Sequence, residues 1–213
     1  MPFVLDHFLI NTDEGAPQAE LLSELGLVEG IPNDHPGQGT ANRRFFFRNA
    51  MLELGYVRDA DEAINGPARR LRTVERTRDA RASPFGVILR ALGDSAEPAF
   101  PGWRYFPDYF GPDTYFYIGE NSDILEEPLC VVMPPNLPPR SSQPLSAEPY
   151  TNVTELRIGV PVSRPSSVLE AIGDVEGITI QLGAPHCMEV VFGHEREGMS
   201  RDLRPALPLV IHW

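Results

Sequence analysis

The sequence predicts an α+β fold in which one order of elements, a strand, a helix and three further strands, occurs near both ends of the chain. Apolar residues alternate with a period of two near both termini, and apolar residues at helical spacing follow each first run. A short motif also recurs after each predicted helix, as Val28-Glu29-Gly30-Ile31 and Val175-Glu176-Gly177-Ile178. The same motif at the same place in two similar element orders favours an internal duplication.

The first unit covers residues 1–57. Residues 3–10 alternate as a strand, and a helix follows that Thr12 or Asp13 can cap and that Gly26 can end. The apolar residues of this helix are Ala19, Leu21, Leu22 and Leu25. The remaining predicted elements are a short strand at 27–31, a turn-rich loop at 34–40 and strands at about 42–48 and 50–57.

The last unit covers residues 151–213 and repeats this order. A strand at 155–162 precedes a helix that Ser166 or Ser167 can cap. The helix has apolar residues at Val168, Leu169 and Ile172. Three further strands are predicted at 178–182, 187–192 and 207–213.

Three segments separate the two units. Residues 58–83 contain arginines interleaved with acidic residues, which predicts a solvated, salt-bridged connection. Residues 84–133 predict additional β structure, and residues 134–150 are rich in proline and predict a linker. The candidate strands of the β-rich segment lie at 85–90, 114–119 and 128–133.

Composition restricts the functions open to the chain. The net charge of -12 argues against a nucleic-acid partner, because nonspecific affinity for phosphate needs a cationic surface. All 18 basic residues are arginine, so chemistry that needs a lysine nucleophile is excluded. Cys130 and Cys187 lie in apolar surroundings, which predicts free thiols in a reducing compartment. We find neither the pattern of a signal peptide nor an apolar run of roughly twenty residues, so we expect a cytoplasmic protein with no membrane partner.

One histidine and one glutamate interrupt apolar strands of the first unit. A carboxylate in an apolar strand needs a cation, a hydrogen-bond network or solvent to be tolerated. If the two strands belong to one curved sheet, the imidazole of His7 and the carboxylate of Glu53 can converge on a common ion. Alternation predicts two sets of residues that share a face, which are Phe3, Leu5, His7 and Leu9 in the first strand and Met51, Glu53 and Gly55 in the later one.

These residues resemble a known group of proteins. The start Leu5-Asp6-His7, the loop His35-Pro36-Gly37-Gln38-Gly39-Thr40-Ala41-Asn42 and the strand Met51-Leu52-Glu53-Leu54 resemble glyoxalase-like proteins of the vicinal oxygen chelate (glyoxalase/bleomycin resistance/dioxygenase) superfamily. The stretch 207–213 resembles a strand of the same group. The resemblance implies paired β-α-β-β-β modules that form a curled mixed sheet around a cleft. Residues 1–57 would be module one and residues 151–213 module two, with 84–133 as an additional β-rich insert.

The resemblance also implies a metal site. In the superfamily the ligands come from the first and fourth strands of each module, which assigns His7, Glu53 and His212. Two histidines and one carboxylate leave open positions on a divalent metal such as Zn, Fe, Mn or Ni. The first strand of the last module offers no histidine as a fourth ligand. If residues 84–133 are instead a degenerate module that follows the first, Glu120 competes with His212.

Two functions follow from the resemblance. The first is a metal-dependent enzyme that acts on a small oxygen-bearing organic molecule by isomerase, lyase or dioxygenase chemistry. Glu53 is then a candidate catalytic group, and His35 and Trp103 are candidate substrate contacts. The alternative is a metal-free protein that binds or sequesters a small molecule in the same cleft. A second copy of the chain, in a homodimer, is a further candidate partner.

Overall fold

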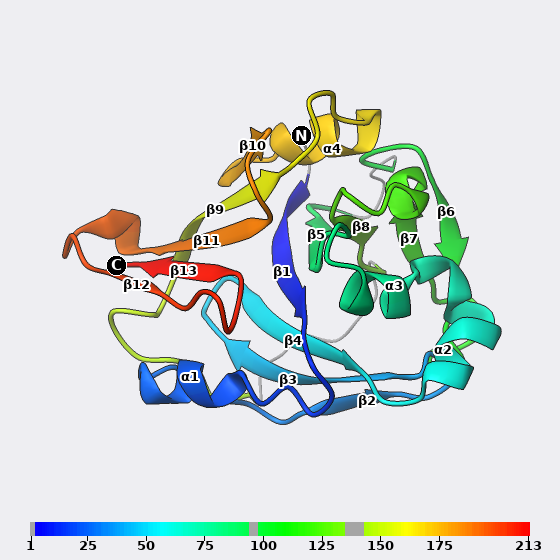
Figure 1. Cartoon of the computed structure of the whole chain (residues 1–213), viewed down its shortest axis with the longest axis horizontal. Helices are drawn as coiled ribbons and strands as arrows, with labels where there is room; N and C mark the ends of the chain where they lie inside the picture. Colours follow the sequence, from blue (N-terminus) through cyan, green and yellow to red (C-terminus); the bar gives the residue numbers. More distant parts are fainter. Residues whose placement is uncertain (1–2, 94–97, 135–142) are drawn as a thin grey trace.

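A computed structural model describes residues 3–93, 98–134 and 143–213 (Figure 1). The first elements are β1 (Phe3–Asn11), α1 (Ala19–Glu24), β2 (Asn33–His35), β3 (Thr40–Phe46) and β4 (Met51–Val57). Three short helices follow, which are α2 (Ala60–Asn65), η1 (Pro67–Leu71) and α3 (Thr73–Arg78). The middle elements are β5 (Phe85–Ala91), β6 (Gly102–Tyr105), β7 (Phe116–Gly119), η2 (Glu120–Asp123) and β8 (Leu129–Val132). The last are β9 (Val153–Val160), α4 (Ser167–Gly173), β10 (Ile178–Leu182), β11 (Cys187–Phe192), η3 (Gly193–Glu195), β12 (Ser200–Asp202) and β13 (Leu209–His212).

One sheet joins module one to the middle segment, residues 84–133. Its strand order is β2-β3-β4-β1-β5-β8-β7-β6, and the central pair, β1 and β5, is antiparallel. Each central strand also has a parallel neighbour from its own half, β4 beside β1 and β8 beside β5. The predicted α+β class with a curled mixed sheet is confirmed. The partner of module one was predicted wrongly, because the middle segment, and not residues 151–213, completes this sheet.

The C-terminal segment, residues 151–213, forms a second sheet with the order β10-β9-β11-β13-β12. Its elements follow the predicted order, but their pairing differs from that of module one. In module one the first strand, β1, lies beside the fourth, β4, whereas β9 lies between β10 and β11. The likeness of the two ends of the chain is therefore one of element order and not of strand pairing.

Several element boundaries also differ from the sequence prediction. Helix α1 begins at Ala19, after the N-cap residue Gln18, and within the described residues no side chain caps it. Thr12 and Asp13 are thus not its caps. Residues 27–31 contain one isolated bridge, Glu29 to Phe45, and the strand β2 lies further along, at Asn33–His35. Residues 135–142 of the predicted linker lie outside the described residues, and Gln143 and Ser146 of its second part accept hydrogen bonds from the backbone amides of Ile31 and Val28.

The eight-stranded sheet curls, so that it has a convex and a concave face (Figure 1). Phe8 and Ile10 of β1 and Val87 of β5 face the convex side, where they share one hydrophobic core with residues of the second sheet such as Leu156. Helix α1 covers the convex side of module one through Leu22. The concave side holds a separate, smaller apolar cluster to which η1 contributes Ala68 and Leu71. The segment 58–83 is thus partly buried and not wholly solvated as predicted.

Helix α4 of the C-terminal segment packs on the middle half of the sheet. Ser166 is its N-cap, as predicted, and accepts a hydrogen bond from the Leu169 amide. The buried carboxylate of Glu127 accepts hydrogen bonds from the backbone amide of Ser166 at 2.8 Å and from its hydroxyl at 2.6 Å. Glu127 also accepts from the side-chain amide of Asn121 at 2.9 Å. These bonds fix the C-terminal segment to the loop that leads into β8.

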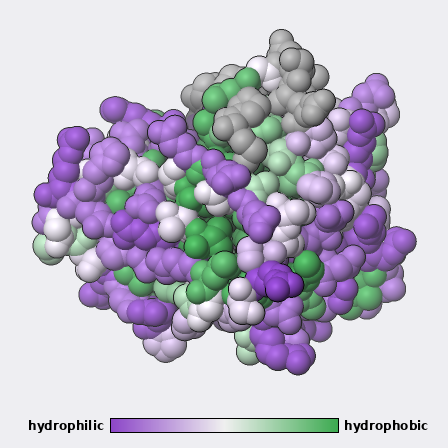
Figure 2. Space-filling model, turned by 90° about the horizontal axis from the view of Figure 1, so that it is seen from above, coloured by the Kyte–Doolittle hydropathy of each residue, from purple (hydrophilic) through white to green (hydrophobic). Residues whose placement is uncertain are grey.

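The surface reflects the acidic, polar composition of the chain. Figure 2 shows hydrophilic residues over most of the face seen from above, with a band of hydrophobic residues along its middle. In the part of the chain that the structure describes, no helix has the length and apolar character needed to cross a membrane.

Candidate functional site

A β-bulge in β1 places two consecutive side chains on the concave face. The pairing with β5 shifts between Leu5 and His7, so that Asp6 is the extra residue. As a result Asp6 and His7 point to the same side, and the Asp6 Oδ1 atom lies 2.7 Å from the His7 Nδ1 atom. The predicted common face of Phe3, Leu5, His7 and Leu9 is therefore wrong. Phe3 and Leu5 contact the convex core instead.

Glu53 lies beside His7, as the sequence predicts. The parallel pairing of β1 with β4 puts Glu53 opposite Leu9, and the Glu53 Oε2 atom lies 3.5 Å from the His7 Nε2 atom. The other carboxylate oxygen of Glu53 accepts a hydrogen bond of 2.6 Å from the Asn42 side-chain amide on β3. The side chains of His7 and Glu53 are 10% and 12% exposed, so the pair sits at the bottom of the concave face.

Burial controls the charge of this pair. Desolvation lowers the pKa of His7 to about 4, although the nearby Glu53 carboxylate opposes this change. Desolvation likewise lowers the pKa of Arg44, which lies opposite Glu53 in the pairing of β3 with β4. His7 is therefore a neutral imidazole near neutral pH, in contact with two carboxyl groups.

A second group of polar side chains lies beside the pair, around His35. The His35 Nδ1 atom is 2.9 Å from the Thr40 hydroxyl, at the end of the tight hairpin between β2 and β3. The Tyr109 ring lies 5.6 Å from the His35 ring, and its hydroxyl donates to Gln38 at 3.1 Å. Desolvation lowers the pKa of His35, which the Glu53 carboxylate partly offsets. His35 therefore lies within electrostatic reach of Glu53.

An open cavity of about 330 Å³ adjoins this second group. It is lined by Asp34, His35, Pro36, Gly39, Thr40, Arg58, Asp59 and Glu62. The hairpin that shapes it needs glycine at position 39, where φ is +71° and a Cβ atom would lie 2.3 Å from the carbonyl oxygen of Asp59. The cavity opens beside His35 at the rim of module one.

The middle half of the concave face is apolar. The positions on β5 that match the side of His7 are Gly86, Ile88 and, at the end near Asp6, Arg90, and those on β8 are Leu129 and Val131. These residues pack with Leu71 of η1 and with Tyr105 and Ile118. In the family that the sequence resembles, this half would supply two of the metal ligands. Here the corresponding strands offer glycine, hydrocarbon side chains and Arg90 on this face, and none of these is a metal ligand.

The residues present do not fit a metal held by three or more protein side chains. His7 and Glu53 offer only two metal ligands. Glu53 in addition already accepts a hydrogen bond from Asn42. Residues 3–93, 98–134 and 143–213 contain no group of three or more His, Cys, Asp or Glu side chains arranged to hold a metal. Zinc normally requires three or four such ligands.

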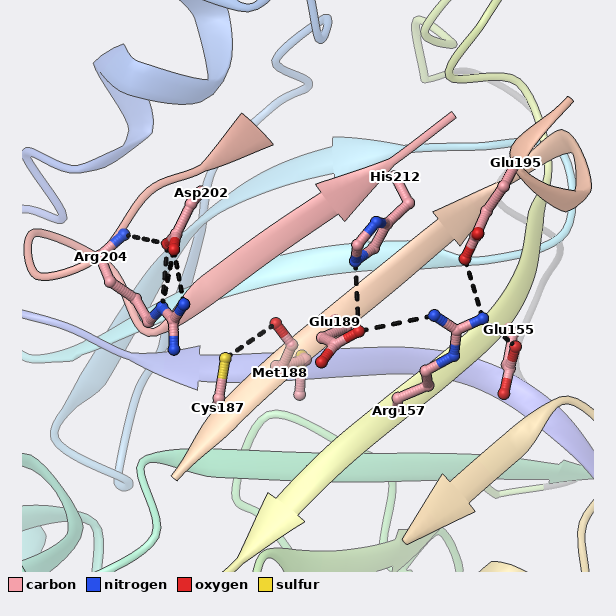
Figure 3. A network of polar contacts seen from close by, with 9 residues as sticks. All are labelled: Glu155, Arg157, Cys187, Met188, Glu189, Glu195, Asp202, Arg204 and His212. Atoms are coloured by element: carbon pink, nitrogen blue, oxygen red, sulfur yellow. Dashed lines mark hydrogen bonds and ion pairs between the residues drawn. The ribbon is translucent and has the colours of Figure 1, made fainter. Parts of the chain in front are cut away.

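His212, the third predicted ligand, lies in the second sheet and is not brought to His7. Its Nε2 atom is 3.2 Å from the Glu189 Oε2 atom on β11 (Figure 3). Glu189 also lies 3.5 Å from Arg157, which pairs with Glu155 and Glu195 at 2.8 Å each. His212 therefore belongs to an ion-pair network of the C-terminal segment.

The two other predicted residues lie in the middle segment. Glu120 is exposed in η2, where its backbone amide donates to Pro101. Trp103 packs on the apolar cluster, and the Arg70 guanidinium covers its ring at 4.0 Å. Its indole nitrogen donates to the Ser122 hydroxyl at 3.3 Å. Of the six predicted site residues, His7, Glu53 and His35 are thus gathered in module one.

Sequence reasoning missed Asp6 and Asn42 as site residues. Alternation along β3 places Asn42 on the same face as Thr40 and could have identified it. Asp6 could not be found in this way, because alternation turns the neighbour of His7 to the opposite face unless a bulge intervenes. Tyr109 reaches the site from the distant middle segment.

Comparisons with known proteins identify the fold and no family. No protein-family model matches the chain, and no curated protein matches it. Among solved structures, the chain is similar to a crystal structure of a hypothetical protein from Staphylococcus aureus. The two are 11% identical, the alignment covers 99% of each chain, and the TM-score is 0.55. This likeness extends over the whole chain, including the C-terminal segment.

Proposed function

We propose that the protein is a glyoxalase-like member of the vicinal oxygen chelate superfamily that binds a small oxygen-bearing organic molecule at the concave face of module one and transfers a proton on it. The observation that carries the proposal is the contact of a neutral, buried imidazole with two carboxyl groups, at 2.7 Å and 3.5 Å. His35, which lies within electrostatic reach of Glu53, lines the adjoining polar cavity. The resemblance of residues 5–7, 35–42 and 51–54 supports the family assignment.

In the proposed reaction His7 acts as the base. A neutral imidazole accepts a proton from a carbon next to a carbonyl group or from a hydroxyl group, and returns it to a second atom of the same molecule. The imidazolium formed in between lies beside Asp6 and Glu53, whose negative charge favours it. The overall change is an isomerisation, and no step in it uses a metal.

Metal-free binding without turnover is the second candidate. Two observations favour this second function. The strands β5 and β8 of the middle half present no metal-ligating side chains on the concave face, and the side chains of His7 and Glu53 have little exposure. Both functions use the same residues. They differ only in whether the bound molecule exchanges a proton. The metal-dependent enzyme expected from the sequence differs from both in its response to chelation.

The experiment that separates these functions uses hydroxyacetone as the probe. Proton NMR in D₂O measures the exchange of its carbon-bound hydrogens, with and without EDTA. We expect exchange that EDTA leaves unchanged and that His7→Gln lowers at least about 100-fold, which is typical of a general base. His212→Gln is the matched control and should have no effect, since His212 lies in the other sheet.

Each alternative has its own outcome in this assay. Binding of hydroxyacetone without exchange would support sequestration. Loss of exchange in EDTA, with recovery on adding Zn, Mn, Fe or Ni, would support the metal-dependent enzyme and contradict the metal-free proposal. Equal exchange in the wild type and His7→Gln would contradict the role of His7.

A further inference from the structure

We infer that Asp6 is the positioning residue of His7: its carboxylate holds the imidazole hydrogen on Nδ1, so that Nε2 is the atom that accepts a proton from a bound molecule. The first support is the backbone. In a regular strand Asp6 and His7 would point to opposite faces, and the bulge between Leu5 and His7 removes that alternation. The bulge thus creates a contact between sequence neighbours that an ordinary strand forbids.

The distances then decide which nitrogen carries the hydrogen. A neutral imidazole has one N–H group, and an ionised carboxylate can only accept. Asp6 Oδ1 lies 2.7 Å from Nδ1, within the range of a strong hydrogen bond, whereas Glu53 Oε2 lies 3.5 Å from Nε2, beyond that range. The hydrogen therefore resides on Nδ1 and bonds to Asp6. The Nε2 atom then carries no hydrogen and faces Glu53.

A third residue orients Asp6 in turn. The Arg90 Nε atom on β5 lies 3.4 Å from Asp6 Oδ2, and it can only donate. Asp6 therefore presents one oxygen to Arg90 and the other to His7. The positive charge of the Arg90 guanidinium complements the Asp6 carboxyl group, whose side chain is only 11% exposed.

The functional consequence rests on the proposed function. If His7 is the base, Nε2 must be free of hydrogen before the molecule reacts. Without the Asp6 carboxylate the imidazole could carry its hydrogen on Nε2 and donate it to Glu53. His7 would then remain in place but could no longer accept a proton at that atom.

Asp6→Asn tests this inference with little change in shape. The Asn oxygen should face Arg90, which needs an acceptor, so that the amide group donates to Nδ1 and the imidazole hydrogen moves to Nε2. Long-range ¹H–¹⁵N NMR of the full chain, labelled at histidine and recorded at neutral pH, distinguishes the two tautomers. The His7 signal is assigned by its absence from His7→Gln.

We expect the Nδ1–H form in the wild type, the Nε2–H form in Asp6→Asn and no change in Asp79→Asn, a surface control on an aspartate bound to Arg81. An Nε2–H form in the wild type would overturn the inference, as would an unchanged tautomer in Asp6→Asn. If the variant fails to fold, the wild-type spectrum alone still decides which nitrogen carries the hydrogen.

The hydroxyacetone assay supplies the second readout. Asp6→Asn should lower proton exchange at least about 100-fold while the unfolding midpoint in urea stays near that of the wild type. Absence of exchange in the wild type would contradict the proposed function. The tautomer of His7 would then be decided by the NMR spectrum alone. Full exchange in an Asp6→Asn protein with the Nε2–H tautomer would contradict the positioning role.

Discussion

Module one and the middle segment form the two halves of one sheet, with the same strand pairing, yet they differ on both faces. On the concave face module one presents His7, Glu53 and Asn42, whereas the middle segment presents mainly hydrocarbon side chains, with Arg90 at its border with module one. On the convex face module one is covered by α1 from its own sequence, and the middle segment is covered by α4 from the C-terminal segment.

This difference shows that two halves of a sheet can have the same strand pairing and still differ in the polar groups that they present. A paired fold with ligands from both halves would place its reacting group between them. Here one half holds the polar groups and the other supplies an apolar wall against which η1 packs. The chemistry of module one is therefore expected to depend on local partners, Asp6 and Asn42, and the middle segment contributes Arg90 of β5 through its ion pair with Asp6.

The largest expected effect comes from exchanging the residues on the matching fourth strands. Val131→Glu places a carboxylate in the apolar cluster, and we expect it to lower the free energy of unfolding by about 3–5 kcal/mol, because its neighbours there, Ile88, Ile118 and Leu129, are hydrocarbon side chains. The reverse change, Glu53→Val, removes the partner of the buried Asn42 amide and should cost about 1–3 kcal/mol. Urea denaturation measures both. Equal losses would show that the two halves do not differ in polarity as described.

The pH dependence of stability gives the next effect. Because the folded-state pKa of His7 is lowered from 6.5 to about 4, the unfolded chain binds a proton in this range that the folded chain does not. Stability should therefore fall as the pH drops from about 6.5 to about 4, by about 3 kcal/mol from this group. His7→Gln should flatten the curve over this window, as measured by urea denaturation at several pH values. An identical curve in the variant would show that His7 does not remain neutral on folding.

The smallest expected effect concerns the convex face. Ser166→Ala removes the cap of α4 and one donor to Glu127, and should destabilise the protein by about 1–2 kcal/mol. Ser167→Ala, at the exposed next position, is the matched control and should change stability by less than about 0.5 kcal/mol. Gln18→Ala at the start of α1 should also have little effect, since its side chain caps nothing within the described residues. A similar loss in all three variants would remove the contrast between the two helices.

Local signals in the sequence predicted much of the fold. The strand at 178–182 and that at 187–192 coincide with β10 and β11, and Ser166 was identified as a cap, because alternation and capping depend on neighbouring residues. Strand pairing was not predictable in this way. Whether module one pairs with the middle or the C-terminal segment is decided by contacts between residues far apart in the chain, and an element order common to both ends suggested the wrong partner.

The candidate site shows the same limitation, because local patterns identified some of its residues but could not predict which strands would be neighbours. His7 and Glu53 were found together because each interrupts an apolar strand, and β1 does lie beside β4. His212 also interrupts an apolar strand, but its carboxylate partner is Glu189 in the other sheet. Period-two reasoning assigned a face within one strand and could neither select the sheet nor detect the bulge that brings Asp6 to His7.

The packing of α4 has a consequence for the order of folding during synthesis. Module one emerges from the ribosome together with α1, so the part of its convex face that Leu22 covers can be buried as soon as residue 57 is available. Phe85, Val87 and Leu89 of β5 must wait for residues 151–213 before they are buried. For the time needed to translate those residues, the middle half of the sheet exposes an apolar surface. Nascent chains stalled near residue 150 should therefore bind chaperones. Chains in which residues 151–213 have also left the ribosome should not.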